Sequence, residues 1–323
     1  MIHGAFGSRV MLTAMRILHV PTIVTMSLCY VGVAAETHKP ETPGSFQVFL
    51  EHSLERQHAG MADVEAFYAR AWTFWIDHLE DFEQHPDHYQ SILSLYYKDQ
   101  DHYRNNSGRN IDRFGPEVDK FKELDAHNTV PAKPILFVGS SSIVQWKTAL
   151  AFPSYPVVNR GFGGSTLADL NHFYDDVVKK YKPSVIVMYC DNDIYRGDSP
   201  QVALQRFKEF VSRVAHDLPE TELLYLSIKP TPADAFYGQH VRENAEVANS
   251  LFKAFIATQK NVRYVDVARA MVEDGKLRTD IFIDGMHLNE RGYAIWNPIV
   301  GKQLAAVYHP SLGSGARGRQ RAQ

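Results

Sequence analysis

The chain has 323 residues, of which 45% are hydrophobic and 22% charged, a composition typical of a globular protein with a sizeable core. Its formal net charge of −3 argues against a nucleic-acid-binding protein or a protein held on an anionic membrane by charge. Length and composition together indicate one large folded domain with an extension.

Residues 1–35 have the pattern of a secretory signal peptide. Arg9 and Arg16 provide a positive start, an apolar centre follows, and small residues lie at the exit. This pattern predicts cleavage after residue 35 and a periplasmic or secreted protein. The alternative is an uncleaved membrane anchor, the one case in which the membrane would be a partner. His19 and Pro21 disfavour the anchor, because a spanning helix needs about 20 predominantly apolar residues.

Residues 36–112 are predicted to form an N-terminal helical extension. The polar stretch 36–45 contains two prolines and a glycine, which indicates a linker. Apolar side chains then recur at helical spacing and predict an amphipathic helix that ends at His85-Pro86. They are Val64, Tyr68, Ala71, Trp72, Trp75, Leu79 and Phe82. A second, weaker helix is predicted over 89–103. We expect the aromatic stripe to be packing rather than a cofactor site.

The same extension is rich in histidine and aspartate. The residues are His78, Asp81, His85, Asp87, His88, Asp99 and His102. A metal site is conceivable from these side chains, but their spacing matches no known ligand pattern. We interpret them as the solvated faces of a helical hairpin and predict no metal site.

Strand-like apolar runs alternate with helical patterns over residues 113–309. The strands are predicted at Ile135–Val138, Pro156–Val158, Ser184–Tyr189, Leu223–Ile228 and Val262–Val267, and the helices at 113–125, 167–181, 200–217, 241–260 and after 291. This alternation predicts a flavodoxin-like three-layer α/β/α sandwich with a five-stranded parallel sheet. The short basic tail, 310–323, is predicted to be disordered.

Four short blocks of polar residues or glycines lie where the predicted strands end or the last helix begins. They are Gly139-Ser140-Ser141-Ser142-Ile143, the glycine-rich segment 159–166, Cys190-Asp191-Asn192-Asp193, and Asp284-Gly285-Met286-His287. Each has an ordinary explanation by itself, such as a turn, a helix cap or a surface pair. The glycine-rich segment follows neither the dinucleotide nor the P-loop spacing.

Taken together, the blocks have a chemical logic. Ser141 would lie beside the free N–H groups of a helix start, which suit a developing negative charge. Asp284, three residues before His287, can accept a hydrogen bond from one imidazole nitrogen and leave the other free as a base.

The order and spacing of these blocks resemble the SGNH (GDSL-type) hydrolase family, in the branch whose first block reads Gly-Ser-Ser-Ser-Ile. The resemblance covers about 113–307 and implies a hydrolase domain over 113–309. It implies that Ser141 is the nucleophile, His287 the base and Asp284 the residue that orients it. The oxyanion hole would comprise the N–H groups of Ser141 and Gly164 and the side-chain amide of Asn192. The family needs no metal and no organic cofactor.

The third block departs from the family pattern. The family usually has a glycine two residues before the asparagine, whereas Tyr189-Cys190-Asp191-Asn192 is one residue short and has Cys190 at the glycine's place. Asn192 must therefore reach the site from a tighter turn. Cys190 as a rival nucleophile is a weaker hypothesis, since no histidine is assigned to it. If the signal is cleaved, Cys190 is the one cysteine left and no internal disulfide can form.

The resemblance predicts a serine esterase that cleaves small acyl or O-acetyl esters, with esters, acetylated carbohydrates or lipid esters as substrates. An α/β-hydrolase is disfavoured, because its nucleophile elbow requires a glycine where this chain has Ile143. The alternative function is a catalytically weak or inactive binding module on the same fold, with the helical extension as its docking surface.

Overall fold

The computed structural model describes residues 39–54, 70–71, 73–75, 77–95, 111–234, 239–283 and 285–309. Four predicted features lie outside the described residues. They are the signal peptide, the basic tail, the part of the second helix beyond residue 95, and Asp284. Within the described ranges, no helix has both the length and the hydropathy of a membrane-spanning segment.

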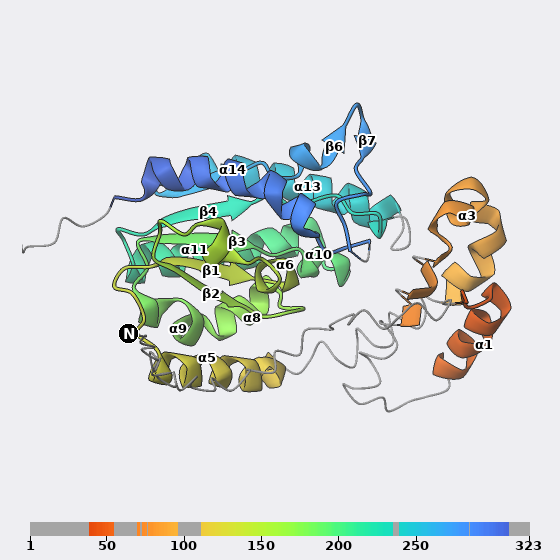
Figure 1. The fold of residues 1–323 in the computed structure, drawn as a ribbon, viewed down its shortest axis with the longest axis horizontal. Coiled ribbons are helices and arrows are strands. Elements are labelled where there is room, and N and C mark those ends of the chain that lie inside the picture. The colour runs from red at the N-terminus through yellow and green to blue at the C-terminus, as the bar shows by residue number, and fades with distance from the viewer. Residues whose placement is uncertain are drawn as a thin grey trace, which may run out of the picture. The chain divides into compact units, whose positions relative to one another are not determined.

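The centre of the described structure is a five-stranded parallel sheet, as predicted (Figure 1). Its strands are β1 (Ile135–Gly139), β2 (Val157–Gly161), β3 (Val185–Tyr189), β4 (Glu222–Leu226) and β5 (Val262–Val265). They lie in the order β2-β1-β3-β4-β5, and all the paired strands are parallel. This is the flavodoxin-like order, in which the chain reverses its direction of winding between β1 and β3. Ligands of such sheets bind at the carboxyl ends of the strands beside this point.

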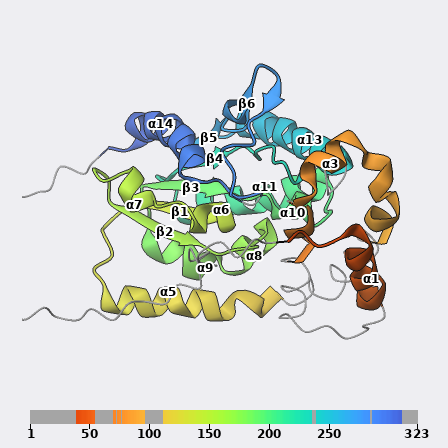
Figure 2. The ribbon, with the colours of Figure 1, turned by 45° about the vertical axis from the view of Figure 1, so that its right-hand side comes forward.

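Helices cover both faces of the sheet, because alternate side chains of each strand point to opposite faces. Leu136 and Val138 of β1 belong to one buried apolar cluster, together with residues of α8 (Leu167–His172), α11 (Pro200–Asp217) and α13 (Gln239–Ile256). Ile135 and Phe137 belong to the other, with residues of α14 (Glu290–Val307). In Figure 2 the strands lie between α14 and α5 (Gly115–His127). The predicted three-layer sandwich is confirmed.

The helices of the sandwich agree with the predicted ranges to within a few residues, except over 167–181. There the chain forms α8, α9 (Tyr174–Val177) and the 3₁₀ helix η3 (Lys179–Tyr181). Arg213 of α11 donates to the Asn171 carbonyl, which in an unbroken helix would accept from residue 175. This long-range hydrogen bond favours the break, and no local pattern indicates it.

Short elements complete the sandwich. Near the first polar block, residues 139–143, are α6 (Ser141–Val144), α7 (Thr148–Ala151) and α10 (Asn192–Tyr195). The 3₁₀ helices η2 (Ile111–Phe114) and η4 (Arg269–Met271) lie elsewhere in the chain. The hairpin of β6 (Val272–Glu273) and β7 (Lys276–Leu277) was not predicted. Its turn, Asp274-Gly275, has φ of 50° and 77°, and Asp-Gly is a known sequence signal for such hairpins.

The N-terminal extension is helical where it is described. It contains α1 (Pro43–Leu54), α3 (Leu79–Gln84) and η1 (Pro86–Tyr89), and residues 90–95 are helical. The predicted helix end at His85-Pro86 is confirmed. The linker predicted over 36–45 was wrong for residues 43–45, because α1 already begins at Pro43. Thr42 Oγ1 accepts from the Ser45 N–H at 3.2 Å and Pro43 occupies the first turn, so this pair starts a helix.

The aromatic side chains of the extension pack on one another, as expected. The Phe46 and Phe74 rings stack with centroids 4.0 Å apart, and Trp75 meets Phe82 edge to face. These rings are buried, and each aromatic pair contributes about 0.5–1.5 kcal/mol beyond its burial.

Candidate active site

The candidate nucleophile lies in a sharp turn from β1 into α6. Gly139 has φ of 135°, and a Cβ atom at this position would lie 1.8 Å from the Tyr189 carbonyl oxygen. Only glycine fits there, because neighbouring β3 approaches so closely. The Ser140 N–H donates to that same carbonyl at 3.0 Å. Ser141 is the first residue of α6. Because it stands at the helix start, its N–H has no partner within the helix.

The structure brings Ser141 and His287 into contact although 146 residues separate them. Ser141 Oγ lies 2.7 Å from His287 Nε2, which is hydrogen-bonding distance. In this geometry a neutral imidazole can accept the hydroxyl proton, which is what activates a serine as a nucleophile.

His287 is held by a short loop that leads into α14. The Ile283 N–H donates to the His287 carbonyl at 2.8 Å, and Gly285 between them has φ of 76°. Asn289 then caps α14 by accepting from the N–H groups of Arg291 and Gly292. Residues 285–289 thus lead into a helix cap and present the imidazole at the edge of the sheet.

Three side-chain contacts tie α14 to the segment that follows Ser141. The Tyr293 hydroxyl donates to the Ser142 carbonyl at 2.7 Å, and Trp146 Nε1 donates to Asn297 Oδ1 at 2.9 Å. On the surface, Lys147 pairs with Glu290 at 2.7 Å. These contacts fix the distance between the helix that carries the serine and the helix that follows the histidine.

Asp284 lies outside the described residues. Its orienting role therefore stays a prediction from its position three residues before His287.

The glycine-rich segment reaches the serine, as its position in the sequence predicts. A Cβ atom on Gly163 would lie 3.8 Å from the Cβ of Ser141. Gly164 has φ of 76°, and its carbonyl accepts from Arg196 Nη2 at 2.8 Å, which fixes the orientation of the Gly164–Ser165 peptide. Asn159 Nδ2 donates to the Ile143 carbonyl at 2.7 Å and so joins β2 to α6.

The third block turns tightly after β3 and starts α10 at Asn192. Asn192 Nδ2 donates to the Ser165 carbonyl at 2.9 Å, which ties this block to the glycine-rich segment. A side-chain amide carries two hydrogens, so this bond uses one of them.

Cys190 is buried beneath the site, and its Sγ donates to the Ser165 carbonyl at 3.3 Å. Burial, reinforced by the neighbouring aspartates, raises the pKa of this thiol well above its usual value. Because the thiolate is the reactive form, the structure argues against Cys190 as the rival nucleophile.

We therefore expect iodoacetamide to leave Cys190 of the native protein unmodified and ester hydrolysis undiminished. Peptide mass spectrometry checks the modification, and the same treatment in denaturant is the positive control. Parallel loss of activity and alkylation of Cys190 would contradict this prediction.

A buried ion pair beneath Ser141 was not predicted from the sequence. Lys229 is fully buried, and its Nζ lies 3.6 Å from Asp191 Oδ2. Asp191 accepts from the Ser140 hydroxyl and the Tyr189 hydroxyl, each at 2.9 Å. Lys229 Nζ also donates to Ser142 Oγ at 3.3 Å and to the Tyr189 hydroxyl at 3.2 Å. The pair thus holds both serines that flank Ser141.

The sequence signal for this pair is a charged residue directly after a buried strand. Lys229 follows β4 at the edge where β1 and β3 also end. A lysine at this edge without solvent needs an acidic partner, which Asp191 supplies.

A doubly wound sheet with a serine–histidine pair at its carboxyl edge is an architecture of hydrolases. Residues 139–295 match the model of the GDSL-like lipase/acylhydrolase family. The domain that contains these residues is of this family, also called SGNH, and the chain is an ester hydrolase. The match contains all four blocks singled out in the sequence.

Solved structures show the same fold. A protein from Streptococcus pneumonia, named for platelet activating factor, is 25% identical with a TM-score of 0.53, over 58% of this chain and 90% of that one. An acylhydrolase-like protein from Bacteroides fragilis is 19% identical with a TM-score of 0.50, over 61% and 96%. A GDSL-like lipase from Bacteroides thetaiotaomicron is 16% identical with a TM-score of 0.51, over 62% and 98%. No curated protein matched the chain.

Proposed function

We propose that this protein is a serine esterase that cleaves small acyl or O-acetyl esters through an acyl-enzyme on Ser141. The 2.7 Å contact between Ser141 Oγ and His287 Nε2 is the observation that carries the proposal. His287 takes the hydroxyl proton as Ser141 Oγ attacks the ester carbonyl carbon. It then passes that proton to the leaving alkoxide oxygen as the ester C–O bond breaks.

The second half of the reaction reverses these roles with water. His287 removes a proton from water, the hydroxide attacks the acyl carbon, and the bond to Ser141 Oγ breaks as that oxygen regains a proton. Asp284 would accept from the other imidazole nitrogen and stabilise the imidazolium in both halves. No metal or organic cofactor is needed for these steps.

The negative charge on the carbonyl oxygen would be held by the N–H groups of Ser141 and Gly164 and by the Asn192 amide. The position of Ser141 at the start of α6 supports the first donor, and the close approach of the Gly163 backbone to Ser141 supports the second. The second hydrogen of Asn192 Nδ2 is the third donor, since the first is used by Ser165.

A fluorophosphonate probe tests the proposal, because it reacts covalently with an activated serine. We expect labelling of Ser141, identified by peptide mapping, with hydrolysis of p-nitrophenyl acetate lost in proportion. Absence of both labelling and hydrolysis would instead support a non-catalytic binding module on this fold.

Replacing Asn192 by alanine should lower kcat for p-nitrophenyl acetate by a factor of about 10²–10³, with a smaller change in KM. The reason is that the amide would stabilise the oxyanion of the transition state rather than the ground-state ester. Asn128→Ala, at an exposed asparagine of the same sandwich, is the control. An unchanged kcat in Asn192→Ala would remove this residue from the oxyanion hole.

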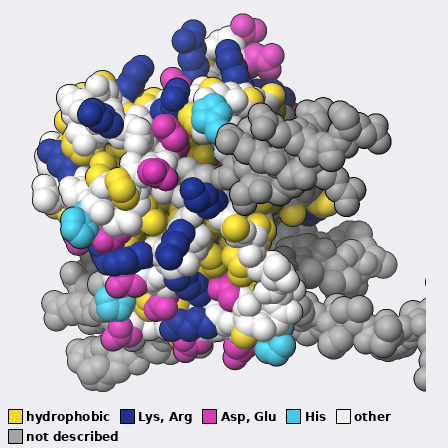
Figure 3. Space-filling view, turned by 90° about the vertical axis from the view of Figure 1, so that its left-hand side faces the viewer, with side chains coloured by type: hydrophobic (Ala, Val, Ile, Leu, Met, Phe, Trp, Pro, Cys, Tyr) yellow, Lys and Arg dark blue, Asp and Glu magenta, His cyan; other side chains and the backbone are white. Residues whose placement is uncertain are grey.

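The substrate class is tested with esters of increasing acyl length, accompanied by acetylated sugars. We expect kcat/KM to be highest for acetyl and other short acyl groups. On the described part of the face shown in Figure 3, basic and acidic side chains are mixed rather than gathered by sign.

We also propose that the protein is exported to the periplasm or outside the cell, on the pattern of residues 1–35. N-terminal sequencing of the protein from its producing cell should find a chain that begins near Glu36. A chain that keeps the apolar segment would support the membrane anchor instead.

A further inference from the structure

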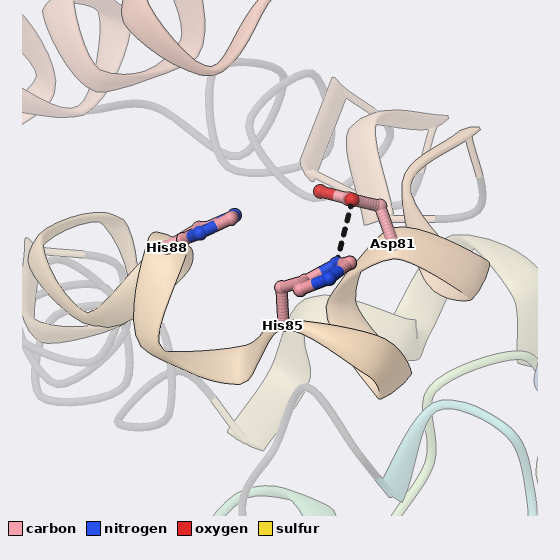
Figure 4. A group of neighbouring side chains, drawn as sticks. All are labelled: Asp81, His85 and His88. Carbon is pink, nitrogen blue, oxygen red and sulfur yellow. Dashed lines mark hydrogen bonds and ion pairs between the residues drawn. The ribbon is translucent and has the colours of Figure 1, made fainter.

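Three polar side chains of the N-terminal extension converge on one point. They are Asp81 of α3, His85 at the corner and His88 of η1 (Figure 4). One ligand atom from each lies within 4.8 Å of the others, and all three side chains are exposed. We propose that these three residues bind a zinc ion. The proposal does not rest on the ester hydrolase activity.

One edge of the site already has the spacing of metal ligands. Asp81 Oδ1 lies 3.2 Å from His85 Nδ1. In a tetrahedral zinc site with bonds of about 2.0–2.1 Å, neighbouring ligand atoms lie about 3.3–3.4 Å apart. The His85 and His88 rings are stacked, with centroids 5.0 Å apart and planes at 8°. The His88 ligand atom lies within 4.8 Å of the other two, so binding would require a rotation of this exposed side chain.

The donor set favours zinc over calcium or magnesium. Two imidazole nitrogens and one carboxylate oxygen suit a first-row transition metal, whereas calcium and magnesium prefer oxygen ligands alone. Three protein ligands leave a fourth position for water. Bound zinc would replace the hydrogen bond between Asp81 and His85 and would join α3 to η1 across the corner.

A buried neighbour orients the carboxylate. The Tyr89 hydroxyl donates to Asp81 Oδ2 at 2.5 Å, which leaves Oδ1 directed to His85. The Tyr89 ring is buried, with Phe82 5.6 Å away between ring centroids. An orienting partner of this kind is typical of metal ligands, and its loss costs about 10–100-fold in metal affinity.

A break in the helix at His85 explains why the sequence of this group shows no known metal motif. Asp81, His85 and His88 are at positions i, i+4 and i+7, which share one face of a continuous helix. The chain breaks at His85, with φ −136° and ψ 58°, and continues as a 3₁₀ turn. This corner changes the direction of the His88 side chain. The three residues therefore do not follow the pattern of metal ligands on one continuous helix.

The test is a zinc titration of the full chain after removal of metals with a chelator. A chromophoric competitor reports the free zinc, and we expect one equivalent to bind and to raise the thermal midpoint. His85→Ala and His88→Ala should each lose this equivalent. His216→Ala is the matched control and should keep it, because it removes an exposed histidine that contacts an aspartate in another part of the chain.

Tyr89→Phe provides a finer measurement. It keeps the buried ring and removes the hydroxyl, so zinc should still bind but with affinity lower by about 10–100-fold. Cobalt in place of zinc gives a second readout, since its visible absorption reports coordination by these ligands. The proposal is overturned if the His85→Ala/His88→Ala double variant binds zinc with the stoichiometry and affinity of the unmodified protein.

Discussion

Replacing Ser141 by alanine is expected to lower kcat for p-nitrophenyl acetate by a factor on the order of 10⁶, the loss seen when a serine hydrolase loses its nucleophile. The substitution removes the oxygen that would form the acyl bond. It should leave the fold intact, because the hydroxyl contacts His287 at the surface of the sheet edge and supports no core packing. Circular dichroism and the thermal midpoint check the fold beside the kinetics.

The control for this prediction is Ser154→Ala, at an exposed serine of the same sandwich, which should keep full activity. His287→Ala should lose activity on a similar scale, and the double variant should lose little more, because the two side chains act as one unit. Retained turnover in Ser141→Ala would refute the assigned nucleophile.

Replacing Lys229 by methionine should lower the free energy of unfolding by about 3–5 kcal/mol, the cost of leaving one partner of a buried ion pair without the other. Asp191 would keep its hydrogen bonds from Ser140 and Tyr189 but lose the positive charge beside it. Ser142 would also lose its contact with Lys229 Nζ. We therefore expect a lower kcat in the fraction that remains folded. Urea unfolding measures the first effect and active-site titration the second.

The matched control is Lys147→Met, which breaks the exposed pair with Glu290 and should leave the free energy of unfolding almost unchanged. A second test is Lys229→Met combined with Asp191→Asn. Removing both charges should recover part of the lost stability, because the buried carboxylate no longer lacks a counter-charge. A Lys229→Met protein as stable as the unmodified chain would contradict the role of the pair.

The sequence by itself determined the elements of the sandwich and the blocks of the site. Strands and helices alternate with clear periods, so the parallel sheet followed from local patterns. Gly139 before a serine run predicted a tight turn at the end of β1, and its φ of 135° confirms that turn. Local patterns predicted the structure less well where a long-range contact determines it. The helix predicted over 167–181 is interrupted where Arg213 donates to the Asn171 carbonyl.

Only the tertiary structure decided which polar residues meet. His287 reaches Ser141 across 146 residues through contacts of α14 with the serine segment. Lys229 and Asp191 become partners because β3 and β4 are neighbours in the sheet and end at one edge. The physical reason is that periodicity and turn chemistry act over a few residues. The pairing of the buried charges and the contact of Ser141 with His287 depend on strand order, which only the packed sheet supplies.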